Sequence, residues 1–124
     1  LMEKQLKKLN NAHSLSELNQ WLVDRTFNEK VLRQIEKDFA QLDLSLDVEN
    51  PEIISLIQEV IDHLLHDDYQ KLMNLLYRID LSERKIRALR NYDPTMPERD
   101  VITFLIIQRE MQKVMFREMY REGS

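Results

Sequence analysis

The densest group of side chains that could do chemistry lies between residues 59 and 68. Glu59, His63 and His66 follow one another at spacings of four and three, so on a helix they share one narrow stripe. Imidazole nitrogens and carboxylate oxygens are ligands for zinc, manganese and iron. One hypothesis is therefore a metal-binding protein or a metal-dependent enzyme that uses this stripe.

A simpler interpretation of the same stripe is a solvated acidic face. The apolar side chains of residues 56–64 lie roughly opposite Glu59 and the two histidines on a helical wheel. Segment 51–68 also holds five acidic residues and no Lys or Arg. A di-iron carboxylate bundle would need Glu-x-x-His motifs on two helices, and the chain has none. The pattern thus favours water over metal as the neighbour of these side chains.

A second group of side chains is basic. Arg84, Arg87 and Arg90 are spaced by three and advance slowly along one side of a short helix. Guanidinium groups arranged in this way can bind phosphate or an acidic partner. The net charge of −4 and the lack of interleaved aromatic residues argue against nucleic acid. The favoured interpretation is a surface helix whose bases meet the acidic segment 51–68 within the fold.

The third and most suggestive pattern runs along residues 104–120. Methionine recurs there every four residues, continuing an apolar stripe, and a basic row runs parallel to it. Methionine side chains adapt to varied apolar partners. The residues predicted to bind a partner protein are Phe104, Met111, Met115, Arg117, Met119 and Tyr120.

The length of this last segment raises the question of what covers its apolar side. A helix over residues 97–121 would be about 37 Å long, whereas a compact domain of this size has a radius of gyration of about 14 Å. The last turns should therefore extend past the body of the protein. A second copy of the chain or another protein is one source of cover. The alternative is the N-terminal helix, folded back so that Leu6 and Leu9 supply the cover.

Several kinds of active site are excluded by residue types that the chain lacks. It has no cysteine, and its one glycine is Gly123, next to the last residue. Phosphate-binding loops, dinucleotide fingerprints and calcium loops need glycine in their turns, and thiolate chemistry needs cysteine. Ser14 and Ser82 are better explained as helix caps than as nucleophiles. The sequence therefore favours a protein that is not an enzyme, and we expect no cofactor.

Helices must position all these groups. Ser14 and Glu17 form a capping box that opens one helix, and Asn28 is expected to open the next. Residues 43–50 alternate apolar and polar side chains, which is typical of an extended linker. The start signals that follow are Pro51, Asp67 or Asp68, Ser82, and Thr95 with Glu98 around Pro97.

Six or seven helices and no strand predict an all-α fold. We expect a single-domain bundle over residues 1–124 with a long C-terminal helix, in which residues 1–13 form a loosely attached N-terminal helix. Of the 124 residues, 43% are hydrophobic and 32% are charged, which is typical of a soluble globular domain.

The same sequence predicts a cytoplasmic location and a binding role. No apolar stretch approaches the roughly 20 residues of a spanning helix, so no membrane contact is expected. Residues 1–11 lack a secretory signal, and the absence of cysteine fits a reducing compartment. The function that fits best is a small protein-interaction module, an adaptor or regulator, that forms a homo-oligomer through its C-terminal helix.

Overall fold

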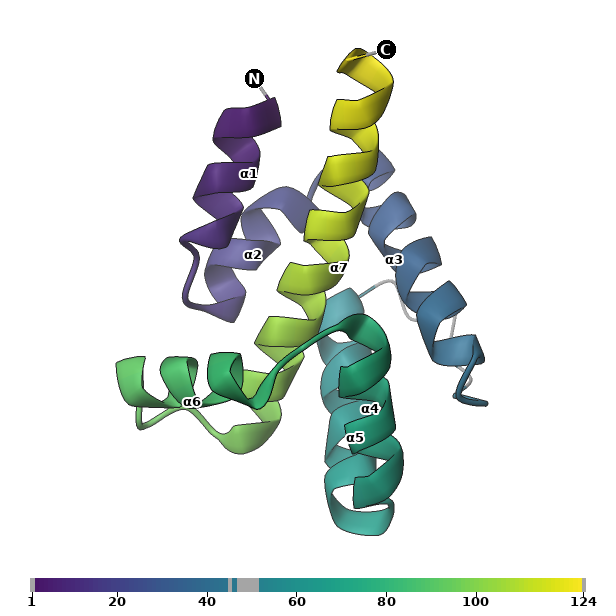
Figure 1. The fold of residues 1–124 in the computed structure, drawn as a ribbon, viewed down its shortest axis with the longest axis vertical. Helices are drawn as coiled ribbons and strands as arrows, with labels where there is room; N and C mark the ends of the chain where they lie inside the picture. The colour runs from purple at the N-terminus through teal and green to yellow at the C-terminus, as the bar shows by residue number, and fades with distance from the viewer. Residues whose placement is uncertain (1, 45, 47–51, 124) are drawn as a thin grey trace.

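The computed structural model describes residues 2–44, 46 and 52–123, and within these ranges it contains seven α-helices and no strand (Figure 1). The all-α prediction, with its long C-terminal helix, is confirmed. The helices are α1 (Met2–Asn10), α2 (Leu15–Leu22), α3 (Arg25–Ala40), α4 (Ile53–Asp67), α5 (Tyr69–Ile79), α6 (Glu83–Tyr92) and α7 (Glu98–Gly123).

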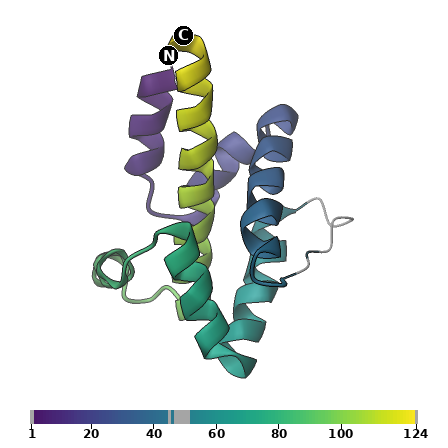
Figure 2. The same ribbon diagram turned by 45° about the vertical axis from the view of Figure 1, so that its right-hand side comes forward.

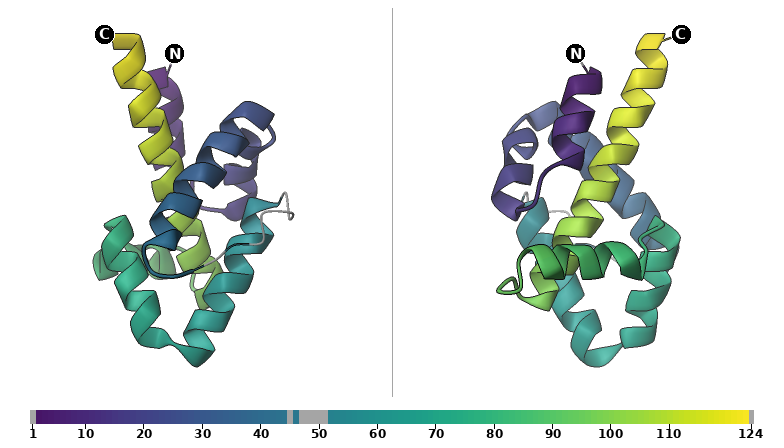
Figure 3. Two further views of the ribbon diagram at one scale, coloured as in Figure 1. Left: turned by 90° about the vertical axis from the view of Figure 1, so that its right-hand side faces the viewer. Right: turned by 60° about the vertical axis from the view of Figure 1, so that its left-hand side comes forward.

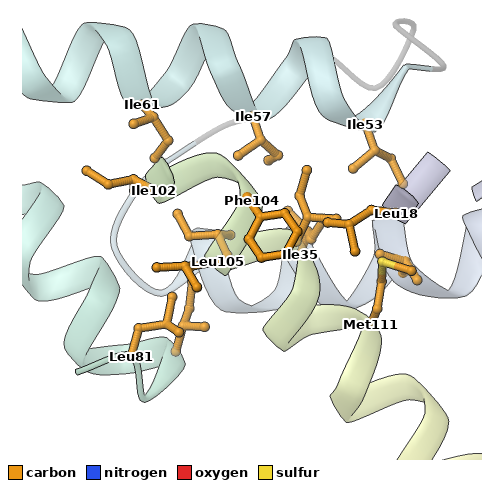
Figure 4. Close-up of a cluster of buried hydrophobic side chains, with 14 of the residues drawn as sticks. Leu18, Ile35, Ile53, Ile57, Ile61, Leu81, Ile102, Phe104, Leu105 and Met111 are labelled. Carbon is orange, nitrogen blue, oxygen red and sulfur yellow. The ribbon is translucent and has the colours of Figure 1, made fainter. Parts of the chain in front are cut away.

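The fold is organised around α7. Each of the other six helices packs against it, so the first half of α7 is enclosed from every direction. All residues from Val101 to Ile107 are buried, which explains why this stretch is apolar without helical periodicity. In Figure 4, Ile57 and Ile61 of α4 point toward Phe104 and Ile102 of α7.

The helix starts follow side-chain caps, most of them predicted. Ser14, Asp68 and Ser82 each accept a hydrogen bond from a backbone N–H in the first turn of the helix that follows. The start predicted at Asn28 is wrong, because Asp24 caps α3 four residues earlier by accepting from the backbone N–H of Phe27.

Two further predictions about helix starts have different outcomes. The Thr95 hydroxyl donates to Asp93 Oδ1 at 2.6 Å, so it stabilises the preceding turn and does not form the predicted box with Glu98. The start at Pro51 lies outside the described residues, as does most of the predicted linker over residues 43–50.

The chain makes left-handed turns with aspartate where other proteins use glycine. Asp43 follows α3 with φ 56°, and Asp80 ends α5 with φ 67°. Asparagine and aspartate tolerate this region better than other residues with a Cβ. The near absence of glycine therefore does not keep the backbone out of tight turns.

The N-terminal helix packs against α7. Leu6 and Leu9 of α1 are buried, and the Nε2 atom of Gln108 in α7 donates to the Leu9 carbonyl at 2.9 Å. Figure 2 shows α1 running alongside α7, while α4 and α5 form a V whose corner lies at the opposite end of the molecule.

Candidate interaction surface

The predicted metal stripe lies on the exposed face of α4. His63 Nδ1 lies 2.8 Å from Asp67 Oδ2, and His66 Nδ1 lies 2.7 Å from the backbone oxygen of Asp62. That backbone contact, together with the Asp62 carboxylate, raises the pKa of His66. Each histidine is thus held by a residue four positions away on its own helix, and Glu59 is exposed beside them.

These side chains do not converge on a common point. Across residues 2–44, 46 and 52–123, no three His, Asp or Glu side chains are grouped so that they could hold a metal ion. The side chains of Glu59, His63 and His66 are all exposed on this face of α4.

The predicted basic group on α6 is also exposed, but its ion pairs differ from those expected. Arg87 lies 3.7 Å from Glu83 on the same helix, and Arg90 lies 3.8 Å from Glu98 at the start of α7. These pairs do not involve the acidic segment 51–68, which we expected as the partner. Arg84 is exposed and lies beside them. The acidic segment and the basic residues of α6 thus remain separate surfaces.

The predicted partner-binding residues of α7 divide into a buried set and an accessible set. Phe104, Met111 and Met115 are at most 2% exposed, because the surrounding helices, α1 among them, cover this side of α7. The sequence left two sources of cover open for the apolar side of α7. For these buried residues the N-terminal helix is the one that contributes. The members that reach the surface are Arg117, Met119 and Tyr120.

An apolar groove of about 450 Å³ lies beside the outer turns of α7, between α1, α2 and the start of α3. Trp21 and Phe27 line it, and Trp21 Nε1 donates to Gln5 Oε1 across the groove at 2.9 Å. The remaining lining residues are Met2, Gln20, Asp24, Thr26, Lys30, Met115 and Glu118.

A second groove, of about 240 Å³, lies between α3 and the same turns of α7 and is strongly basic. Among the described residues, five cationic side chains and one carboxylate line it, giving a charge of +4 on a chain whose net charge is −4. Its lining residues are Lys30, Arg33, Gln34, Lys37, Val114, Arg117, Glu118 and Arg121. Such a concentration of one sign attracts anionic groups.

The two grooves adjoin at one ion pair. Lys30 and Glu118 line both of them, and the Lys30 ammonium lies 2.9 Å from Glu118 Oε1. The hydrogen bond from Lys30, with the nearby charges of Arg121 and Arg117, lowers the pKa of Glu118. Arg117 in turn donates to Gln34 of α3. Figure 3 shows the outer turns of α7 that carry these residues, with α1 beside them.

A buried polar cluster joins α3 to α7 further inside the protein. Lys113 Nζ lies 2.8 Å from Asp38 Oδ2 and 3.1 Å from Glu110 Oε1, and Gln34 donates to Asp38 at 3.1 Å. Asp38 is buried and Glu110 is fully buried.

The pKa values of the two carboxyl groups in this cluster are shifted in opposite directions. Burial and the hydrogen bond with Asp38 raise the pKa of Glu110 to about 8, so at neutral pH it carries a proton. Burial acts to raise the pKa of Asp38 as well, but hydrogen bonds from Lys113, Glu110 and Gln34 outweigh it and lower that pKa. The cluster is therefore one carboxylate, one carboxylic acid and one ammonium. Because Glu110 is fully buried, we assign it a structural role in the contact between α3 and α7.

The sequence carried a signal for this cluster. Asp38 shares a helical face with Val31 and Ile35, and Glu110 occupies the face of Ile106 and Ile107. A charged residue on an apolar stripe indicates a buried partner. The basic groove had only part of its signal in the sequence, because two of its cations belong to the basic row of α7 and the other three come from α3, which showed no such row.

A third groove, of about 570 Å³, lies on another side of α7, next to α6. The rings of His13 and Tyr92 stack there with centroids 4.1 Å apart. Gln108 and Gln112, which also line it, donate to α1 and so hold that helix in place. The amide groups of these two glutamines are thus used in packing.

Comparison of the chain with protein-family models, with curated proteins and with solved structures gives no match. Among the described residues, no helix combines the length and the apolar character needed to cross a membrane.

Proposed function

We propose that this chain is a helical module that binds a partner protein at the end formed by α1, α2, α3 and the outer turns of α7. The observation that carries the proposal is the adjacency of the apolar groove and the basic groove there. Protein interfaces often combine an aromatic and Met-rich centre with charges that set orientation. Trp21 and Phe27 provide the first, and Arg33 and Lys37 provide the second.

The shape of the two grooves also supports a macromolecular partner. A small-molecule site usually encloses most of its ligand in a cavity with a few converging polar groups. Both grooves here are open to solvent, and all of their charged lining residues except Glu118 are exposed. An extended contact with a protein surface uses such open troughs more fully than a metabolite does.

Site-specific photocrosslinking in the cell that makes the protein tests this proposal. A photoreactive amino acid in place of Gln20, at the apolar groove, should form an adduct with one defined protein. The same substitution at Asn91, an equally uncharged and exposed residue on α6, should not. Equal labelling from both positions, or no protein adduct from Gln20, would contradict the proposal.

A further inference from the structure

The end of the molecule farthest from the grooves has the opposite charge. Asp67 and Asp68 lie at the corner between α4 and α5, with Asp62 one turn before them, and all three are exposed. No Lys or Arg accompanies the five acidic residues of segment 51–68. In Figure 1 this corner lies at the bottom of the long axis, while the outer turns of α7 lie at the top.

The corner also carries an aromatic side chain beside its acids. Tyr69 follows directly after Asp68 and is 55% exposed. An exposed aromatic ring next to carboxylates matches, feature for feature, an apolar groove next to a basic groove. Tyrosine is also one of the residue types that most often anchor protein interfaces.

Accepting the proposed function, we propose that the partner seated in the two grooves is a second copy of this chain. Its α4–α5 corner places Tyr69 in the apolar groove and directs Asp67 and Asp68 to the basic groove. Arg33 and Lys37 are the main cationic contacts, because neither forms an ion pair with another described residue.

The distance between the two surfaces makes this contact intermolecular. The 26 residues of α7 span about 39 Å, and the corner lies beyond the first turn of that helix (Figure 1). A chain therefore cannot place its own corner in its own grooves. Because the two surfaces differ, the contact is head-to-tail. Each copy can bind one copy at its grooves and another at its corner, so assembly gives an open filament unless a ring closes.

Two neutralised variants test the contact from its two sides. The groove variant carries Arg33→Gln and Lys37→Gln, and the corner variant carries Asp67→Asn and Asp68→Asn. Asparagine preserves the helix cap that Asp68 provides for α5. In sedimentation velocity, the mean mass of the wild type should rise with concentration. The association constant of each variant alone should be at least about tenfold lower than that of the wild type.

Mixing the two variants gives the decisive measurement. The groove variant retains an intact corner and the corner variant retains intact grooves, so an equimolar mixture should associate at wild-type strength but stop at two chains. A symmetric contact between like surfaces would not produce this result. A wild type that stays monomeric at every concentration, or a mixture that does not recover, would overturn the proposal.

Two controls distinguish loss of the contact between chains from loss of the folded structure. All four substituted side chains are exposed, so both variants should unfold at the wild-type denaturant concentration. A matched variant with Arg84→Gln and Arg87→Gln removes the same charge from α6 and should associate like the wild type. If self-association fails while the Gln20 crosslink still captures another protein, the proposed function stands and only its occupant changes.

Discussion

The two halves of α7 meet the rest of the protein in different ways. The inner half, taken here as residues 98–115, is enclosed by other helices, and even its contact with α3 is a buried cluster of Asp38, Glu110 and Lys113. The outer half, from Phe116 onward, meets α3 through an exposed contact, the Lys30–Glu118 pair, with an open groove on either side.

This difference shows how one continuous helix serves two purposes. The inner half contributes apolar area and a buried polar cluster in which Lys113 and Gln34 donate to Asp38, and these contacts fix the position of α3. The outer half is held by the same neighbours but leaves its charges in water, where ion pairs contribute little to stability. The stable half thus presents the other half as a rigid surface.

The largest difference should appear when one aromatic ring is removed from each half. Phe104→Ala leaves a cavity in the core and should lower the free energy of unfolding by about 3–5 kcal/mol. Phe116→Ala, at a side chain that is 48% exposed, should cost less than about 1 kcal/mol. Urea denaturation of both variants measures this. Similar losses for the two would show that the halves do not differ.

Removing a lysine from each contact with α3 makes a second matched test. Lys113→Met leaves Asp38 buried without its ammonium, which should cost about 3 kcal/mol at neutral pH. Lys30→Met breaks the exposed pair and should cost at most about 1 kcal/mol. The same denaturation experiment gives both values. A loss for Lys30→Met that equals the loss for Lys113→Met would mean that the outer contact is also structural.

The buried acid Glu110 should make the contribution of the inner half to the free energy of unfolding depend on pH. The outer half should show no such dependence. The folded pKa of Glu110 is about 8 and the unfolded value is about 4.5, so the stabilising form is protonated. Its contribution is complete below pH 4.5 and is lost as the pH rises through 8, by at most about 1.4 kcal/mol per pH unit.

The neutral isostere isolates this effect. Glu110→Gln should resemble the wild type near pH 5 and become progressively more stable than it toward pH 8. Glu118→Gln, on the outer half, is the matched control, because the pKa of Glu118 is lowered and its titration ends below this range. Urea denaturation at several pH values measures both. Parallel stability curves for wild type and Glu110→Gln would contradict a protonated Glu110.

The helices were predictable because their signals are local. Ser14, Asp68 and Ser82 each cap a helix within three residues of themselves, and the stripe of α7 repeats within a single segment. The start of α3 was misplaced because both Asp24 and Asn28 are good capping residues. Spacing alone does not choose between them.

The candidate surface was only half predictable, because it depends on which helices become neighbours. Arg117 and Met119 were identified on α7, but Arg33 and Lys37 lie some 80 positions earlier and showed no pattern of their own. The sequence left open what covers Met111 and Met115. Packing of α1 answered that question and limited the free surface to the last turns.

The smallest expected effect concerns Glu118, the one acid among the described residues that line the basic groove. Glu118→Gln should cost at most about 1 kcal/mol of folding free energy, and less in high salt. It also raises the charge of the groove from +4 to +5, so head-to-tail association should tighten by roughly twofold to fivefold at low salt. Sedimentation velocity at two salt concentrations measures this. Weaker association of Glu118→Gln would show that the Lys30–Glu118 pair shapes the groove, because loss of a repelling charge alone strengthens the attraction.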